Sequence, residues 1–117
     1  MAKPGIYDFD LVKGDTFTRT FVCKDGDGNA VNLTSYDVNW TAKFNKSDTT
    51  ALFDWTSIGG SPEIVVTPSL GMIVVTVTAA ATTLLDFDYA YHEMEVTDGT
   101  HVHTIMEGRV DLKEKLN

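Results

Sequence analysis

The sequence predicts a single all-β domain over residues 1–117, folded as an antiparallel β-sandwich of about seven to nine strands with one short helical turn. Two observations lead to this prediction. Apolar residues recur with period two in several short segments, as expected of strands with one buried face. Segments rich in glycine, or containing proline, separate these runs. The length of 117 residues suits one domain with one core.

The first third of the chain contains three strand patterns. Residues 7–11 alternate aromatic or leucine side chains with aspartates, which predicts an opening strand with one apolar and one acidic face. Residues 15–23 alternate larger side chains with threonine and valine. The acidic, glycine-rich segment 25–29 supplies residues that favour a turn. The next strand covers 37–44, and its core face is expected to carry Val38, Trp40, Ala42 and Phe44.

The middle of the chain predicts shorter strands and the helical turn. Residues 52–55 form a candidate strand, and the break at 59–62 precedes another at 64–66. Residues 72–78 are the most β-branched run, which favours a central strand. A capping threonine followed by alanines predicts a helical turn near 79–85, expected to close one end of the sandwich.

The last third predicts a hairpin, and side-chain matching favours a three-residue loop at 98–100. This loop places apolar and polar side chains on separate faces. Gly108 is expected to mark a bulge or a close backbone approach. The predicted neighbours are Val96 with Val102, Met94 with Thr104, His92 with Met106, and Glu93 and Glu95 beside Ile105 and His103.

Composition narrows the classes of partner. Seventeen acidic residues against nine basic residues give a net charge of -8, and the basic residues form no cluster in the sequence. A nucleic-acid backbone or an anionic membrane would repel such a surface, so neither is an expected partner. The longest apolar runs fall far short of the ~20 residues of a membrane span. No secretory signal is visible at the N-terminus, which favours synthesis in a reducing cytoplasm.

No motif predicts an enzyme or a cofactor. The sequence lacks a nucleophile elbow, a phosphate loop and clustered Cys or His ligands. Asp25, Asp27 and Asn29 have the spacing of calcium ligands, but Tyr36 stands where an EF-hand needs a carboxylate, so an ordinary turn is favoured. Cys23, the single cysteine, lies in an apolar strand pattern and is expected to be a buried structural thiol.

One set of side chains is a candidate interface. Tyr89 and Tyr91 fall on the strand face that carries two glutamates, whereas Trp40 is expected in the core. Tyrosine is common both in protein interfaces and in sugar-stacking sites, so both uses stay open. His101, His103 and Glu95 offer a weak metal pattern, and exposed histidines paired with carboxylates are favoured. The candidate interface residues are Tyr89, Tyr91, Glu93, Glu95, His101 and His103, joined by the chain termini.

Several motifs resemble a known family. These are KGDTF at 13–17, DGNAVNLT at 27–34, the segment 84–91 with its Tyr-Ala-Tyr, and a closing hairpin that ends with EGRV at 107–110. Together they resemble the immunoglobulin-like domains of tailed-bacteriophage virions, above all the N-terminal domain of baseplate upper proteins and related tail-associated proteins. The resemblance spans nearly the whole chain and implies an immunoglobulin-like sandwich.

The resemblance also implies a function. It suggests a non-enzymatic structural subunit of the virion, in the tail, baseplate or neck, made in the bacterial cytoplasm and bound to other virion proteins as a symmetric homo-oligomer. Family members often continue into a fibre or receptor-binding region, and this sequence ends at Asn117. An adaptor is therefore expected rather than direct host recognition. The alternatives are a capsid decoration or cement protein, and a carbohydrate-binding module in host attachment.

Overall fold

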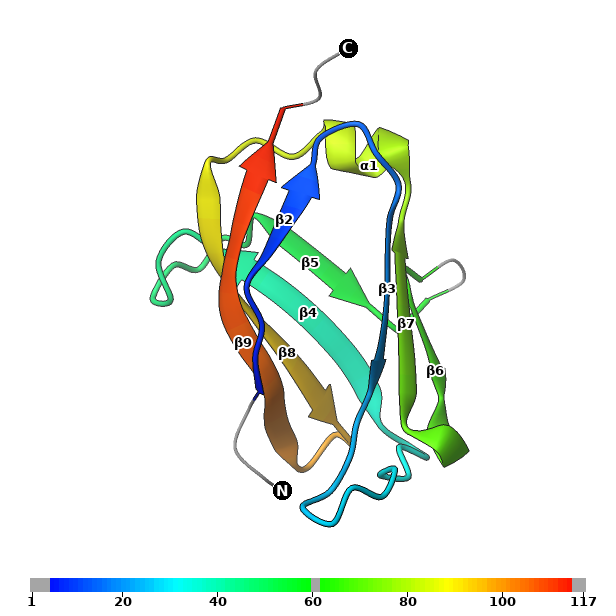
Figure 1. The fold of residues 1–117 in the computed structure, drawn as a ribbon. Coiled ribbons are helices and arrows are strands. Elements are labelled where there is room, and N and C mark those ends of the chain that lie inside the picture. Colours follow the sequence, from blue (N-terminus) through cyan, green and yellow to red (C-terminus); the bar gives the residue numbers. More distant parts are fainter. Residues whose placement is uncertain (1–4, 60–61, 115–117) are drawn as a thin grey trace.

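The computed structural model describes residues 5–59 and 62–114, which fold into two facing β-sheets (Figure 1). This part of the chain contains nine strands, within the predicted range, with one α-helix and one 3-10 turn. In chain order the elements are β1 Gly5–Ile6, β2 Phe9–Val12, β3 Phe17–Val22, β4 Asp37–Lys43, β5 Phe53–Thr56, β6 Ile64–Thr67, η1 Pro68–Leu70, β7 Met72–Val77, α1 Ala79–Thr83, β8 Tyr89–Thr97 and β9 Val102–Lys113.

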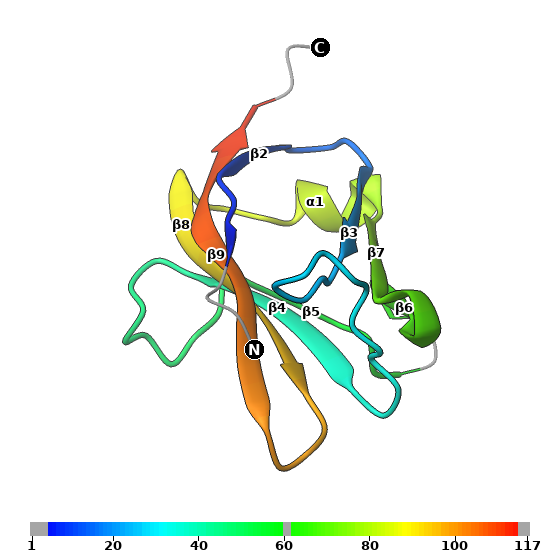
Figure 2. The same cartoon turned by 60° about the horizontal axis from the view of Figure 1, so that its bottom comes forward.

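The larger sheet has the order β1-β9-β8-β4-β5, with β2 also paired to β9, and the smaller sheet has the order β3-β7-β6. The β-branched strand β7 is central in its sheet, as predicted. Most pairs are antiparallel, but β1 and β2 both run parallel to β9. The first two strands of the chain, β1 and β2, therefore lie beside the last strand, β9. Alternation in the sequence does not reveal this pairing. Figure 2 shows the two sheets as separate layers.

Aromatic residues from both sheets surround Trp40 in the core. Trp40 is fully buried, as predicted, and its ring lies 5.2 Å from Phe9, 5.5 Å from Phe21 and 5.3 Å from Trp55, measured between ring centroids. Phe44 was expected on the same buried face and is instead 48% exposed, because β4 ends at Lys43 and the chain turns away from the core.

Helix α1 lies at one end of the sandwich, as predicted, between the end of β7 and the start of β8 (Figure 1). The Thr78 hydroxyl accepts a hydrogen bond from Ala81 N–H at 3.2 Å, which is the expected N-cap. Thr82 is buried, and its hydroxyl accepts from Gly14 N–H at 3.1 Å and donates to Asp15 C=O at 2.8 Å. These bonds fix the helix to the loop between β2 and β3.

The predicted three-residue hairpin loop is wrong. Thr97 pairs with Val102, so the loop spans residues 98–101. The Asp98 carboxylate closes it by accepting N–H bonds from Thr100 at 2.9 Å and His101 at 2.7 Å. These two bonds hold the pKa of Asp98 at about 2. The observed neighbours differ from the predicted ones: Val96 with His103, Glu95 with Thr104, Met94 with Met106, Glu93 with Glu107 and His92 with Gly108.

A β-bulge in β9, and not a three-residue loop, brings the apolar side chains of this strand back to the buried face. The register shifts between Met94 and Glu95, which leaves Ile105 as an extra residue on β9 and returns Met106 to the buried face. Gly108 does mark a close backbone approach, as predicted. A Cβ atom at this position would lie 2.2 Å from the carbonyl oxygen of Tyr7.

Candidate protein-interaction surface

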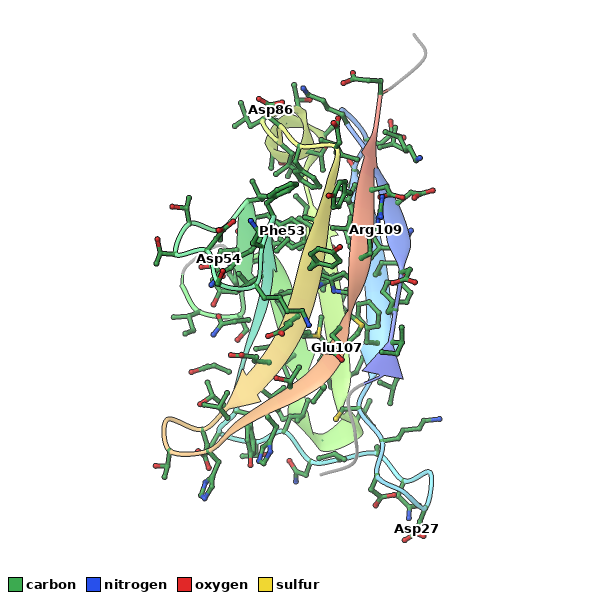
Figure 3. All side chains as sticks on the ribbon, turned by 90° about the vertical axis from the view of Figure 1, so that its left-hand side faces the viewer. Asp27, Phe53, Asp54, Asp86, Glu107 and Arg109 are labelled. Carbon is green, nitrogen blue, oxygen red and sulfur yellow. The ribbon has the colours of Figure 1, made fainter. Side chains whose placement is uncertain are left out.

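The outward face of β8 carries four of the six predicted interface residues. Tyr89, Tyr91, Glu93 and Glu95 alternate with the buried residues at positions 90, 92, 94 and 96, so period two correctly separated the two faces. The same face continues onto β9, where Arg109 and Glu107 lie beside β8 (Figure 3). The four predicted residues of β8 therefore share one outer surface of the larger sheet with Glu107 and Arg109.

The two histidines do not join this surface, which corrects the prediction. His103 lies opposite Val96 on the inner side of the hairpin and is half-buried. His101 is in the loop, where its Nδ1 lies 3.2 Å from a carboxylate oxygen of Asp98. Because the true register differs by one residue from the predicted one, His103 is on the other face, and Glu95 has Thr104 as its neighbour.

An aromatic strip, formed by Phe44, Tyr89 and Tyr91, crosses the outer face from β4 to β8. The Phe44 and Tyr89 rings lie 5.4 Å apart, and the Tyr89 and Tyr91 rings 6.1 Å apart. The Arg109 guanidinium lies 4.3 Å from the Tyr89 ring centroid, in cation–π geometry. Its Nε donates to the Asp111 carboxylate at 2.9 Å, and this bond raises the pKa of Arg109. Sequence reasoning missed Phe44, because its alternation matched the core.

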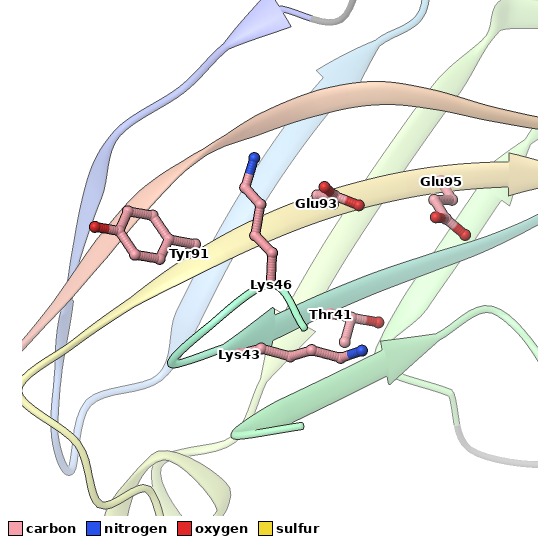
Figure 4. Close-up of a pocket in the computed structure, with 6 residues that line it drawn as sticks. All are labelled: Thr41, Lys43, Lys46, Tyr91, Glu93 and Glu95. Atoms are coloured by element: carbon pink, nitrogen blue, oxygen red, sulfur yellow. The ribbon is translucent and has the colours of Figure 1, made fainter. Parts of the chain in front are cut away.

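A groove with charges of both signs adjoins the aromatic strip. It has a volume of about 220 Å³ and is lined by Thr41, Lys43, Lys46, Tyr91, Glu93 and Glu95 (Figure 4). The register brings Lys43 beside Tyr91 and Thr41 beside Glu93 on neighbouring strands. Lys46 reaches over from the loop after β4, and its Nζ lies 3.9 Å from a carboxylate oxygen of Glu107. The lysines were not predicted, since only the tertiary structure pairs Lys43 of β4 with β8 and brings Lys46, in the loop after β4, over β8 and β9.

The acidic loop after β3 is built as a turn. Asp25 Oδ1 accepts N–H bonds from Asp27 at 2.9 Å and Asn29 at 3.0 Å, so this carboxylate shapes the backbone. In residues 5–59 and 62–114, no group of three or more His, Cys, Asp or Glu side chains is arranged to hold a metal ion. Cys23 is only partly buried, less than expected, and this burial raises the pKa of its thiol.

The chain termini had been expected to join the interface, but residues 1–4 and 115–117 lie outside the described part of the structure. Within the described part, neither helical segment is long and apolar enough to cross a membrane.

Comparison with protein-family models and with curated proteins found no match. Solved structures do match, and one of them is "crystal structure of chicken TCR for 2.0", with a TM-score of 0.56 at 12% sequence identity. The fold is immunoglobulin-like. The match covers 98% of this chain and 55% of that chain, so the domain spans about half the length of the chain it resembles. Identity this low shows a shared fold alone.

Proposed function

We propose that this domain is a non-enzymatic structural subunit of a tailed-bacteriophage virion, in the tail, baseplate or neck, which binds neighbouring proteins through the outer face of β4, β8 and β9. The supporting observation is the aromatic strip beside the groove of lysines and glutamates. The virion setting rests on the resemblance of the motifs at 13–17 and 27–34 to tail-associated domains.

The chemistry of this face suits a protein partner. Tyr91 is 40% exposed and Phe44 is 48% exposed. Folding does not require aromatic side chains at these positions, because smaller polar residues are compatible with the outer face of a sheet. Tyrosine offers a large contact area at low cost in conformational entropy, and aromatic residues are enriched where interfaces are buried. The lysines and glutamates beside the strip would set the orientation of a partner more than the affinity.

The groove also supports a symmetric homo-oligomer. Lys43 and Lys46 line it together with Glu93 and Glu95, so the face carries both signs of charge within a short distance. In an isologous pair the lysines of one copy can meet the glutamates of the other. The net charge of -8 would keep the free subunit soluble until a partner covers this face.

A double substitution tests the proposal. Tyr89→Ser with Tyr91→Ser should leave the subunit folded, since both side chains lie on the outer face, and should prevent its incorporation into phage particles or its association at high concentration. Val65→Ser is the matched control, because Val65 is 58% exposed on the other sheet. Normal incorporation of the folded double variant would exclude this face as the assembly surface.

A carbohydrate-binding function in host attachment is the second candidate. Exposed Tyr91 beside Glu93 in a shallow groove is also an arrangement that stacks on a sugar ring and binds its hydroxyl groups. A glycan array separates the two functions. Binding of one glycan class, lost in Tyr91→Ser, would favour host attachment over assembly.

A further inference from the structure

Strand β3 is an edge strand with backbone groups available for pairing. Within the described residues it pairs with β7 alone. The N–H of Cys23 donates to the Gly71 carbonyl at 2.8 Å, which extends the β3–β7 register by one residue and identifies a hydrogen-bonded pair. Because the direction of the backbone groups alternates along an antiparallel strand, Thr18, Thr20 and Val22 point their N–H and C=O groups away from β7.

The other side of the same sheet confirms this assignment. Thr76 N–H donates to the Glu63 carbonyl at 2.8 Å, so the even-numbered residues of β7 bond to β6. The odd-numbered residues of β7 are therefore left to bond to β3, in agreement with the Cys23 bond.

A groove of about 560 Å³ runs along this free edge, between β3 and the segment that contains β1. Side chains from both sheets line it, and most are apolar. Ile6 is 73% exposed and Val22 is 44% exposed, which is unusual for large apolar residues beside an open strand edge. Tyr7 and Arg19 cross the groove, since Arg19 Nε donates to the Tyr7 hydroxyl at 3.1 Å. The main apolar lining residues are Ile6, Tyr7, Phe21, Val22, Ile105 and Met106.

The charged residues that line the groove, among those that the structure describes, are both positive. They are Arg19 and Lys24, and no aspartate or glutamate in residues 5–59 and 62–114 lines it. This contrasts with a chain of net charge -8. A partner that fits this groove is therefore apolar along its length and carries a carboxylate, which distinguishes it from a partner of the mixed-charge outer face.

We propose that the free edge of β3 takes up an extended segment of another protein as an added antiparallel or parallel strand. The segment carries apolar side chains at every second position, directed into the groove, and an acidic residue at the end that reaches Arg19 or Lys24. Backbone bonds to Thr20 and Val22 supply affinity, whereas the Thr18 carbonyl already accepts a hydrogen bond from Arg19 Nη1 at 2.9 Å. The groove selects the side chains. This surface lies apart from the outer face of β4, β8 and β9, so either proposal can fail without the other.

The probe is the blocked peptide EVTVTVE, with EVVVTTE as a control of equal composition that lacks the alternation. Hydrogen exchange of the Thr20 and Val22 amides should slow about tenfold when free EVTVTVE is at about ten times its Kd. Alkylation of Cys23, the only cysteine and part of the groove lining, should slow in parallel. The control peptide should change neither rate.

Two substitutions at the edge distinguish a paired strand from other occupants. Thr20→Pro removes an outward N–H and should abolish peptide binding, whereas Thr20→Val keeps the N–H and should bind normally. Arg19→Glu changes an exposed side chain, and should weaken binding of EVTVTVE and strengthen binding of KVTVTVK. The Arg19 variant remains informative if Thr20→Pro does not fold.

Three results would overturn the proposal. Slow exchange of the Thr20 and Val22 amides before peptide is added would mean that the edge is already covered, by this chain or, if the effect grows with protein concentration, by a second copy. Undiminished peptide binding by folded Thr20→Pro would mean that the groove holds apolar molecules without strand pairing. No effect of EVTVTVE at millimolar concentration would exclude this chemistry of partner.

Discussion

Trp40 donates a hydrogen bond from its indole Nε1 to Nδ1 of His92, at 3.0 Å, in the centre of the core. Because Nδ1 accepts, the proton of the neutral imidazole is on Nε2, which donates to the carbonyl oxygen of Tyr7. One buried histidine thus joins β4, β8 and the N-terminal segment. Its alternation placed it correctly on the buried face, but nothing in the sequence indicated these two partners.

The first prediction concerns pH. Burial lowers the pKa of His92 from its ordinary value of 6.5, against the opposing effects of the Tyr7 hydrogen bond and of Asp8, Glu107 and Glu93. Protonation would also place a proton on Nδ1, where Trp40 already donates. The unfolded chain therefore binds more protons below pH 6.5, so the free energy of unfolding should fall as the pH drops through this range toward the folded-state pKa.

Urea denaturation at a series of pH values between about 7.5 and 5 measures this effect. His92→Gln is the matched variant, because glutamine stays neutral and retains hydrogen-bonding capacity. The variant should lose the part of the pH dependence that comes from His92. An equal slope in both proteins would show that His92 does not titrate in this way.

The second prediction concerns Trp40, which is the hydrogen-bond donor to His92. Trp40→Ala should lower the free energy of unfolding by roughly 3 to 5 kcal/mol, because it removes a fully buried large aromatic side chain and leaves His92 Nδ1 without its donor. Chemical denaturation measures the loss. Trp40→Phe, which keeps most of the ring volume, should cost less, and a loss below ~1 kcal/mol for Trp40→Ala would contradict the packing described here.

The third prediction concerns Gly108. Gly108→Ala should lower the free energy of unfolding by about 1 to 3 kcal/mol, since the added Cβ would meet the Tyr7 carbonyl oxygen and push β1 away from β9. Gly26→Ala is the control, because its added Cβ would meet no atom within 4 Å. Equal stability of the two variants would show that the N-terminal segment moves away from the added Cβ without lowering the free energy of unfolding.

The fourth prediction concerns the acidic loop. Asp25 uses one carboxylate oxygen to accept two backbone N–H bonds, so the loop is held without an ion. The melting temperature should therefore be the same with millimolar calcium as with a chelator. A reproducible rise with calcium, absent in Asp27→Asn, would instead identify this loop as a calcium site.

The sequence by itself determined the features that depend on neighbouring residues. Alternation placed Trp40 in the core and Tyr91 on the outer face, since each side chain in a strand points away from the previous one. The β-branched run at 72–78 predicted a central strand, observed as β7, and the Thr78 cap predicted the helix. Gly108 predicted a close approach, because a glycine within a strand leaves room for another backbone.

Only the tertiary structure decided which strands are neighbours and in what register. Alternation gives the face of a residue within its own strand, but the loop at 98–101 is one residue longer than predicted, and this reverses the face of His103. The extra residue at Ile105 then returns Met106 to the buried face. The parallel pairing of β1 and β2 with β9, the exposure of Phe44 and the lysines over β8 depend on contacts between distant segments. Such contacts form because the two sheets bury a shared core. The alternation of residues within one strand does not indicate which distant segment will pack against it.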